Sequence, residues 1–393
     1  MKNIGVFFGS RAPEHDISVI TGQLVIAGLK GLGYKVIPVY IGKKGEWFIG
    51  KGLDNIKNFA NIEKLPMAKM ARYYLDLENS VGKLVLKTKS SFLRKTVTID
   101  MAFPTFHGSY GEDGTVQGLF EMLDVPYVGC GVTASAIAMD KALTKQIYRV
   151  HNIPTTEFIY FYKKDWEADK SKIINLINQK LKRSVFVKPV HLGSSIAIAK
   201  IKDNNLKELE HRIEVALHFD NKVLVEEAVE NLMDVTCCVI GNDKPESSLL
   251  QESIFSADLF DFENKYLRGG GAQTGKSKDS VIIPARLDEK TTESIRKTAA
   301  NIYKLMECSG IARVDFLYNK QTKQFFANEI NPLPGTLYHH LWKASGLELN
   351  QLLEKLISFA KERYEQKKEV DYVFQSSVLS SLQSAKLGSK NIS

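Results

Sequence analysis

Four residues near the C-terminal end of the chain have the types and spacing of a metal-binding site. Arg313 and Asp315 lie on one apolar run, Glu329 and Asn331 lie on the next, and polar residues 319–324 separate the two runs. If the runs pair as a hairpin with Asp315 opposite Glu329, then Arg313 lies opposite Asn331, and all four side chains share one face. Opposed carboxylates repel each other unless a cation lies between them, and Mg²⁺ prefers oxygen ligands that include substrate phosphates. The pattern favours nucleotide chemistry, although a surface ladder neutralised by Arg313 fits the spacing equally well.

The bulk composition is that of a soluble, multidomain protein. With 393 residues the chain exceeds one ordinary core, so we expect two or three domains. Its 44% hydrophobic and 25% charged residues are typical of globular proteins. The sequence has no run of about 18 apolar residues, and Met1 leads almost directly into a strand-like segment, which leaves no room for a signal peptide. We therefore expect a cytoplasmic protein that does not bind a membrane.

The cysteines and the net charge exclude several classes of function. Four cysteines are too few for a disulfide scaffold and lack metal-binding spacing, and the adjacent Cys237 and Cys238 fit small core residues. A formal charge of +8 suits nucleic acid, a membrane or small anions. Because no basic stripe with interleaved aromatic residues is present, we expect no nucleic-acid partner. Small anionic substrates therefore remain as the class of partner that fits the positive charge.

The first third of the chain alternates strands and helices. Residues 4–8 predict a buried strand, helical spacing from Ile17 to Ala27 predicts a helix, and residues 35–41 predict a second strand. Such a βαβ unit binds ligands at the carboxyl ends of its strands. Residues 42–98 predict hairpins or loops. A strand at 101–106, a glycine-rich loop at 107–114, a helix around 116–123 and a short strand near 126–129 complete an α/β domain over 1–130.

The remaining two thirds predict an α+β layout. We expect one helix over 133–151, a second over 205–218, and strands over 184–188, 196–200, 223–227 and 235–240. The metal hairpin is flanked by helices near 288–308 and 348–363. Residues 365–393 are rich in Lys, Ser and Gln, so they predict a loosely held, flexible tail. The predicted domains in this part of the chain are 131–226 and 227–364, and the tail is 365–393.

Two glycine-rich segments could contact phosphates. Residues 270–277, GGAQTGKS, match the P-loop pattern, but no strand precedes them and an extended segment follows, so a lid-like loop is the better interpretation. Residues 191–195, HLGSS, predict a tight hairpin tip whose backbone N–H groups and hydroxyls could approach a phosphate beside Lys188. An ordinary turn explains the same residues. Lys141 and Lys145, each taken alone, predict solvent-exposed charges.

Acidic residues also cluster near the predicted ends of strands. Asp16 is a good N-cap for the first helix, whereas Glu14 could point a carboxylate at a substrate amine. His107, Glu112 and Asp113 suggest a metal site, but their position in a turn before a helix makes capping and hydrogen bonding at least as plausible.

Taken together, eight segments resemble the D-alanine:D-alanine ligase family, which has the ATP-grasp fold. Eight such motifs in one order over residues 3–362 make coincidence implausible. The matching segments are GVFFGSRAPEHDIS at 5–18, FHGSYGEDGTVQG at 106–118, PYVGCGVTASAIAMDK at 126–141, FVKPVHLGSSIAIAK at 186–200, KVLVEE at 222–227, FDFENKY at 260–266, IARVDF at 311–316 and NEINPLPG at 328–335.

The resemblance implies a three-domain fold that holds ATP and Mg²⁺. Residues 1–130 would form a Rossmann-like substrate domain, and residues 131–226 and 227–364 would form two α+β domains with the nucleotide between them. Two Mg²⁺ ions, for which Mn²⁺ can substitute, would bind Asp315, Glu329 and Asn331. The residues that would contact ATP are Lys141, Lys188, Gly193, Ser195, Glu226, Glu227, Ala228, Asp234 and Lys265.

The resemblance also implies a reaction through a D-alanyl phosphate. Arg313 and the N–H of Gly335 would stabilise the tetrahedral oxyanion. Glu14, hydrogen-bonded to Ser194 and Tyr266, would bind the ammonium group of the first D-alanine. His107 and His340 would contact the substrates.

The expected activity is D-alanine:D-alanine ligation for peptidoglycan synthesis by a homodimer. Tyr266 favours an amine as the second substrate. His340 stands where the family usually has a small hydroxyl residue, and a protonated histidine can also bind a carboxylate. An ATP-grasp carboxylate–amine ligase with a different second substrate is therefore the main alternative. A nucleotide-binding regulator without catalysis and a P-loop ATPase are the others.

Overall fold

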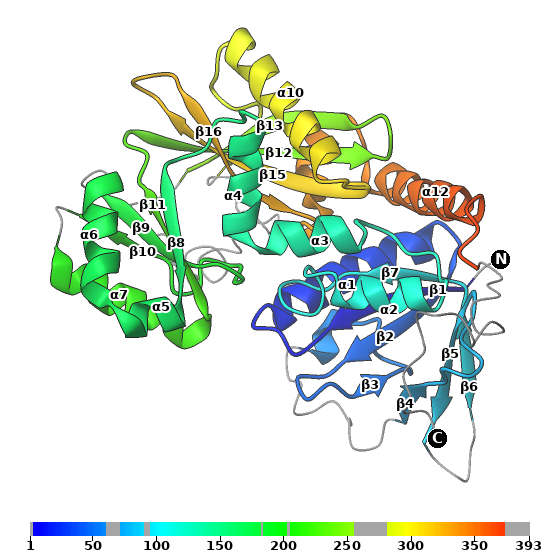
Figure 1. The fold of residues 1–393 in the computed structure, drawn as a ribbon. Coiled ribbons are helices and arrows are strands. Elements are labelled where there is room, and N and C mark those ends of the chain that lie inside the picture. Colours follow the sequence, from blue (N-terminus) through cyan, green and yellow to red (C-terminus); the bar gives the residue numbers. More distant parts are fainter. Residues whose placement is uncertain are drawn as a thin grey trace, which may run out of the picture.

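A seven-stranded sheet forms the N-terminal part of the molecule (Figure 1). The computed structural model describes residues 3–59, 71–89, 95–181, 184–202, 205–254 and 281–373. The strand order is β6-β5-β4-β3-β2-β1-β7, and β1 runs parallel to both β2 and β7. Its elements are β1 (Asn3–Gly9), α1 (His15–Gly31), β2 (Lys35–Ile41), β3 (Trp47–Phe48), η1 (Ile56–Asn58), β4 (Arg72–Leu75), β5 (Leu84–Thr88), β6 (Thr96–Ile99), β7 (Met101–Pro104) and α2 (Thr115–Met122).

The predicted βαβ unit is confirmed, with α1 as the crossover between the parallel strands β1 and β2. Ser18 on α1 fixes the carboxyl ends of two strands, because its Oγ accepts from Gly9 N at 2.8 Å and donates to Thr105 O at 2.9 Å. The segment predicted as hairpins or loops contributes β3 to β6, which pair antiparallel and widen the sheet.

The single helix predicted over 133–151 is two helices, α3 (Val132–Met139) and α4 (Lys141–Val150). The break lies at Asp140, whose φ of −88° and ψ of 97° are extended. Its side chain accepts from Leu143 N at 2.8 Å, so it caps a new helix instead of continuing the old one. The break places Lys141 in the first turn of α4.

A four-stranded sheet follows, with the order β10-β9-β11-β8. Three of its elements, β8 and the helices α5 and α6, have no counterpart in the sequence prediction. The strand predicted to start at Ile196 starts at Ala199, because Ser194, Ser195 and Ala197 have φ of 57°, 59° and 56°, so the turn is a wide loop and not a tight hairpin tip. The elements are β8 (Phe158–Tyr162), α5 (Lys163–Ala168), α6 (Lys170–Lys180), β9 (Val185–Pro189), β10 (Ala199–Ile201), α7 (Leu206–Phe219) and β11 (Lys222–Glu227).

The third sheet has five strands in the order β14-β13-β12-β15-β16, and β13 was not expected from the sequence. The predicted hairpin register is confirmed, since Asp315 pairs with Glu329 and Arg313 pairs with Asn331. The elements are β12 (Leu232–Gly241), β13 (Glu246–Ser253), β14 (Val281–Ile282), α10 (Glu289–Leu305), β15 (Gly310–Asn319), β16 (Phe325–Asn331), η4 (Gly335–Tyr338), α11 (His339–Ala344) and α12 (Leu349–Lys368).

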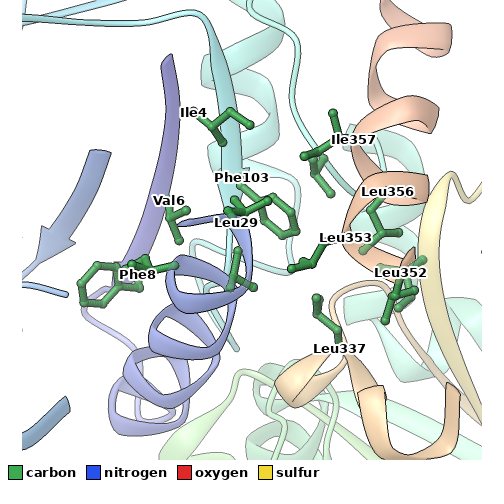
Figure 2. Packing of buried hydrophobic residues seen from close by; sticks show 14 of the residues in the cluster. Ile4, Val6, Phe8, Leu29, Phe103, Leu337, Leu352, Leu353, Leu356 and Ile357 are labelled. Carbon is green, nitrogen blue, oxygen red and sulfur yellow. The ribbon is translucent and has the colours of Figure 1, made fainter. Parts of the chain in front are cut away.

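A hydrophobic core joins the N-terminal sheet to the C-terminal helix. Side chains of β1, β7 and α1 pack against Leu352, Leu353, Leu356 and Ile357 of α12 (Figure 2). Gly28 allows this close contact, because a Cβ there would lie 2.4 Å from Leu353 Cδ1 and the leucine side chain would have to shift. The predicted domain over residues 131–226 is divided between two hydrophobic cores. Helices α3 and α4 pack on the third sheet, whereas β8 to β11 enclose a core of their own.

The last described helix is longer than expected. Helix α12 continues to Lys368 because Lys367 Nζ lies 2.7 Å from Glu121 Oε2 and 3.2 Å from Asp124 Oδ1, which ties the helix end to the N-terminal domain. None of the helices in the described ranges combines the length and the apolar character that a membrane crossing requires. Cys237 and Cys238 are fully buried core residues, as predicted.

Candidate active site

The paired strands β15 and β16 present the four predicted residues on one face of the third sheet. Asp315 is held from three sides: it accepts from Arg313 Nη2 at 2.6 Å, from Thr236 Oγ1 at 2.9 Å and from Asn331 Nδ2 at 3.2 Å. Glu329 lies farther from its cations, 3.8 Å from Arg313 Nη2 and 3.9 Å from Lys141 Nζ. Burial opposes the charge of Arg313, but Asp315 raises the pKa of the guanidinium above its ordinary value, so it stays protonated.

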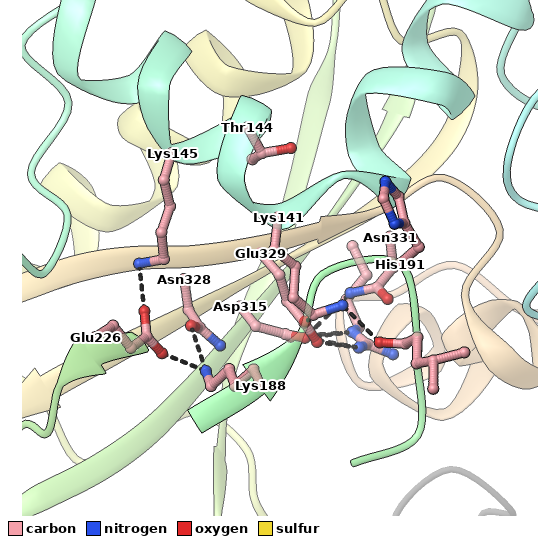
Figure 3. Close-up of polar contacts among 12 residues, drawn as sticks. Lys141, Thr144, Lys145, Lys188, His191, Glu226, Asp315, Asn328, Glu329 and Asn331 are labelled. Atoms are coloured by element: carbon pink, nitrogen blue, oxygen red, sulfur yellow. Dashed lines mark hydrogen bonds and ion pairs between the residues drawn. The ribbon is translucent and has the colours of Figure 1, made fainter. Parts of the chain in front are cut away.

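A β-bulge in β16 adds a residue to this face. The register shifts between Asp315 and Phe316, so that Phe316 pairs with Ala327 and Asn328 is the extra residue. In a regular strand Asn328 and Glu329 would point to opposite faces, but here both side chains point into the site (Figure 3). Asn328 Oδ1 accepts from Lys188 Nζ at 3.4 Å. Sequence reasoning missed Asn328, because no residue type marks this bulge.

Three charged side chains from different elements form a buried cluster beside the hairpin. Lys145 of α4 lies 2.8 Å from one carboxylate oxygen of Glu226, and Lys188 of β9 contacts the other (Figure 3). The prediction that Lys145 is solvent-exposed is wrong: its side chain is 1% exposed, because the inward face of α4 packs on this cluster. Despite burial, the two ammonium groups lower the pKa of Glu226 to about 2, so it is ionised at neutral pH.

The loop between β9 and β10 is fixed at its start, by contacts of residues 191 and 192. Lys141 donates to Leu192 O at 2.6 Å. His191 Nδ1 lies 3.0 Å from Asp220 Oδ1, and its Nε2 lies 3.4 Å from Asp140 Oδ2. Hydrogen bonds to the two carboxylates raise the pKa of His191 to about 9. The imidazolium therefore links this loop to the N-terminus of α4.

Glu14 comes to the same site from the N-terminal domain. It is 5% exposed, and burial followed by the neighbouring Glu112 raises its pKa, while a hydrogen bond from Ser194 opposes the shift. Gly193 and Gly108 leave room for the Glu14 carboxylate, since a Cβ would lie 2.9 Å from one of its oxygens at position 193 and 2.2 Å at position 108. Asp16 is not the helix cap that was considered: α1 already begins at His15, and Asp16 is exposed, 3.5 Å from Lys43.

One cavity collects most of the predicted catalytic groups. Its volume is about 40 Å³, and it lies where the N-terminal domain, the loop after β9 and the third sheet meet. The lining residues are Glu14, Ile17, His107, Glu112, Gly193, Ser194, Arg313, Glu329, Asn331, Leu333 and Gly335. Glu112 and Asp113 also accept backbone bonds from Gly108 and Tyr110 at 2.7 and 2.8 Å, which is the local role that their position in a turn suggested.

The turn after β16 has an unusual backbone that a hydroxyl from the N-terminal domain supports. Thr336, Leu337 and Tyr338 have φ of 49°, 55° and 48°, a left-handed conformation that non-glycine residues rarely adopt. Thr336 N donates to Thr21 Oγ1 at 3.0 Å, and Thr21 Oγ1 lies 2.8 Å from His107 Nε2. Thr21 Oγ1 therefore connects the Thr336 backbone to the ring of His107.

His340 lies just beyond this turn, on α11. Its Nε2 is 2.6 Å from Gln251 Oε1, whereas the buried His340 Nδ1 and Gln251 Nε2 have no hydrogen-bond partner among the described residues. Burial, helped by His339, lowers the pKa of His340 to about 4. A neutral imidazole therefore occupies this position at pH 7, rather than the protonated one that the sequence suggested.

The donor set fits a magnesium ion shared with phosphates. Asp315, Glu329 and Asn331 offer oxygen atoms from adjacent strands, and Mg²⁺ prefers one or two carboxylates together with phosphate oxygens. Over the described ranges, no three His, Cys, Asp or Glu side chains gather closely enough to hold a metal on their own. A cation here would therefore need Asn331 and a phosphate-bearing substrate.

The structure places the remaining predicted residues as follows. Asp234 is two residues from Thr236 on β12, so it shares the face that holds Asp315. Glu227 is the last residue of β11 and Ala228 follows it; their N–H groups donate to Glu157 O and Ser184 O at 2.9 and 3.0 Å, respectively. Ser195 lies in the loop after β9. Lys265, Tyr266 and the P-loop-like segment 270–277 lie outside the described residues.

Family models and relatives cover nearly the whole chain. Residues 3–130 match the model described as the D-ala D-ala ligase N-terminus, and residues 147–358 match the D-ala D-ala ligase C-terminus. A D-alanine--D-alanine ligase of Thermosipho africanus is 38% identical over 372 residues, which cover 95% of this chain and 96% of the relative. The chain belongs to the D-alanine–D-alanine ligase family. The family resemblance seen in the sequence is thus confirmed.

Solved structures of this family share the fold. The D-alanine-D-alanine ligase from Coxiella burnetii superposes with a TM-score of 0.76 at 26% identity, covering 94% of this chain and 98% of that one. The VanG D-Ala:D-Ser ligase from Enterococcus faecalis superposes with a TM-score of 0.75 at 30% identity, covering 91% and 99%. The expected ATP-grasp arrangement, with an N-terminal α/β domain and two antiparallel sheets, is confirmed.

Proposed function

We propose that this protein joins two D-alanine molecules with ATP, through a D-alanyl phosphate, to supply peptidoglycan synthesis. The observation that carries the proposal is the single cavity lined by Glu14, Ser194, Arg313, Gly335 and Glu329. Groups suited to an ammonium, an oxyanion and a metal-bound phosphate converge there from three parts of the fold. Such a ligase works in the cytoplasm, where ATP is available, and we propose that it is a homodimer.

The first step activates a carboxylate. An oxygen of the first D-alanine carboxylate attacks the γ-phosphorus of ATP, the bond from that phosphorus to ADP breaks, and an acyl phosphate forms. Glu14 and Ser194 would hold the substrate ammonium, and Lys141 and Lys188 would contact the phosphates. Glu226, Glu227 and Ala228 would line the adenine, and Asp234 would bind the ribose. Asp315, Glu329 and Asn331 would hold Mg²⁺, which would neutralise phosphate charge.

The second step forms the peptide bond. The free amine of the second D-alanine attacks the acyl carbon, and the C–O bond to phosphate breaks as the tetrahedral oxyanion collapses; the proton that the nitrogen loses is taken up by the departing phosphate. Arg313 would stabilise this oxyanion, and the proposal is supported by its hydrogen bonds to Asp315, which fix the guanidinium, and by its burial. Preorganised donors of this kind are worth about 10²- to 10³-fold in rate each. Gly335 N–H is the second donor in the proposal.

A different second substrate is the alternative that the structure keeps open. A neutral His340 with an unpaired ring nitrogen cannot bind a carboxylate as an imidazolium would, but it can hydrogen-bond to a hydroxyl. A structural relative carries the name D-Ala:D-Ser ligase. The alternative is thus a carboxylate–amine ligase whose second substrate is not D-alanine.

Coupled ADP release with product mass spectrometry tests both possibilities. With ATP, Mg²⁺ and D-alanine as the sole amino acid, we expect ADP, phosphate and D-alanyl-D-alanine in equal amounts. Turnover only after another amine or D-serine is added would select the alternative. ADP release without any amino acid, lost in Lys276→Ala, would instead indicate a P-loop ATPase.

A further inference from the structure

Lys145 is a buried lysine that the proposed mechanism leaves without a role. Its ammonium group lies 2.8 Å from Glu226 Oε2 and donates to Thr155 Oγ1 and Thr156 Oγ1, both at 2.9 Å. An ammonium group has three donors, so all of them are used. Thr156 also donates to Glu226 Oε2 at 3.0 Å. These bonds hold Lys145 against the carboxylate in one position.

Lys188 is held to the same carboxylate much less firmly. It contacts the other oxygen of Glu226, and within the described part of the chain its one further hydrogen bond is a long one of 3.4 Å to Asn328. Its side chain is 10% exposed, against 1% for Lys145 and for Glu226. Two ammonium groups and one carboxylate leave a net charge of +1 in a water-poor environment. The cluster therefore has one more cation than Glu226 requires.

We propose that Lys145 is the permanent counter-ion of Glu226, which allows Lys188 to leave the carboxylate and bind a phosphate of the nucleotide. This inference rests on the proposed use of ATP. Lys145 would act as a positioning residue, because it touches neither nucleotide nor amino acid. Its effect on binding passes through the freedom of Lys188.

The cost of an unpaired buried charge is the physical reason. For a carboxylate as deeply buried as Glu226, loss of the last neighbouring cation costs much free energy, since removing one partner of a buried ion pair is strongly destabilising. With Lys145 present, the departure of Lys188 still leaves Glu226 with an ammonium group and the Thr156 hydroxyl. Without Lys145, Lys188 would be the only ammonium group beside Glu226 among the described residues, and a phosphate would have to compete with the carboxylate for it.

Nucleotide binding by Lys145→Met, measured by calorimetry with Mg²⁺ present, tests this inference. We expect the affinity for ATP to fall by about 10- to 100-fold. Adenosine has no phosphate to draw Lys188 away, so its affinity should change by less than about 2-fold. Lys170→Met, which removes an exposed lysine that lies 2.5 Å from Glu214, is the matched control and should bind both ligands as the wild type does.

Three other outcomes of the binding experiment would each contradict a proposal. Unchanged ATP affinity in Lys145→Met overturns the inference, and so does an equal loss for ATP and adenosine, which would indicate a merely distorted adenine pocket. Absence of ATP binding by the wild type would overturn the proposed function itself.

A second measurement does not depend on the variant folding. Wild-type crystal structures with and without ADP should show Lys145 paired with Glu226 in both, and Lys188 moved from Glu226 to phosphate only with ADP. Lys188 remaining on Glu226 in the nucleotide complex would sink the inference.

Discussion

One hydroxyl group links the two halves of the proposed active site. Thr21 Oγ1 accepts from Thr336 N in the left-handed turn and is hydrogen-bonded to His107 Nε2, and all three residues are buried. The turn begins at Gly335, the proposed oxyanion donor. The position of that donor therefore depends on a residue that lies more than 300 positions earlier in the chain.

Replacing Thr21 with Val should lower kcat without a comparable effect on nucleotide binding. The substitution removes the hydroxyl to which the buried Thr336 N–H donates, which costs about 0.5–1.5 kcal/mol, and the strained turn can then relax. We expect kcat to fall by about 10- to 100-fold and the KM for ATP to stay within about 2-fold. Steady-state kinetics would test this. Thr21→Ser, which keeps the hydroxyl, should retain most activity; a Val variant as fast as wild type would contradict the role.

His340 should make the protein sensitive to acid. Its pKa is lowered from 6.5 to about 4, so between these values the unfolded state binds a proton that the folded state excludes. The stability that neutral His340 contributes is present above pH 6.5 and is lost as the pH falls toward 4. We expect urea unfolding to show a smaller loss of stability over this range for His340→Gln than for the wild type. Parallel losses in the two proteins would argue against a neutral buried imidazole.

Residue types alone were sufficient for some roles and misleading for others. The Asp315–Glu329 register followed from strand alternation, and it is confirmed. Lys145 was misjudged, because a lysine on a helix is exposed in most proteins and only the packing of α4 shows that it is not.

At the scale of elements, ion pairs of His191 fix the start of the loop after β9. His191 contacts Asp140, the N-cap of α4, and Asp220, which precedes β11. Asp140 is also paired with Lys222, whose Nζ lies 2.7 Å away. The first turn of α4 carries Lys141, and the loop carries Gly193 to Ser195. The two elements proposed to contact phosphate are therefore held together by an imidazolium.

This link should weaken in alkaline solution. The pKa of His191 is raised from 6.5 to about 9, so the stability it contributes is fully present below pH 6.5 and is lost as the pH rises through 9. We expect the difference in Tm between wild type and His191→Asn to be constant below pH 6.5 and to shrink toward zero near pH 9.5, as calorimetry would show. A difference that does not depend on pH would mean that the imidazole is neutral.

At the scale of the whole molecule, contacts between distant segments assemble the site. Helix α12 packs on α1, and Arg363 donates to Tyr127 O at 2.9 Å and also to Gly129 O and Ser309 Oγ. These contacts bring the N-terminal domain, which carries Glu14, against the third sheet, which carries Arg313. The proposed nucleotide would add a further connection, between the second and third sheets.

Bound nucleotide should therefore stabilise the folded protein in a metal-dependent way. A ligand at 100 times its Kd adds about 2.7 kcal/mol, which for a chain of 393 residues corresponds to a rise in Tm of roughly 3 °C. We expect this rise with ADP and Mg²⁺, and most of it should disappear when EDTA removes the metal. Differential scanning fluorimetry measures both, with adenosine as the control for adenine contacts alone. The same shift with and without EDTA would speak against a metal held by Glu329 and Asn331.

The sequence by itself determined the family, the βαβ unit and the hairpin that carries Asp315 and Glu329. Those features depend on local periodicity and on ordered motifs, which short segments contain in full. Only the tertiary structure decided that the Asn328 side chain points into the site, that Lys145 is buried and that Thr21 supports the left-handed turn after β16. A bulge, an ion cluster and a hydrogen bond between remote segments depend on which surfaces meet after folding, and no short stretch of sequence specifies that.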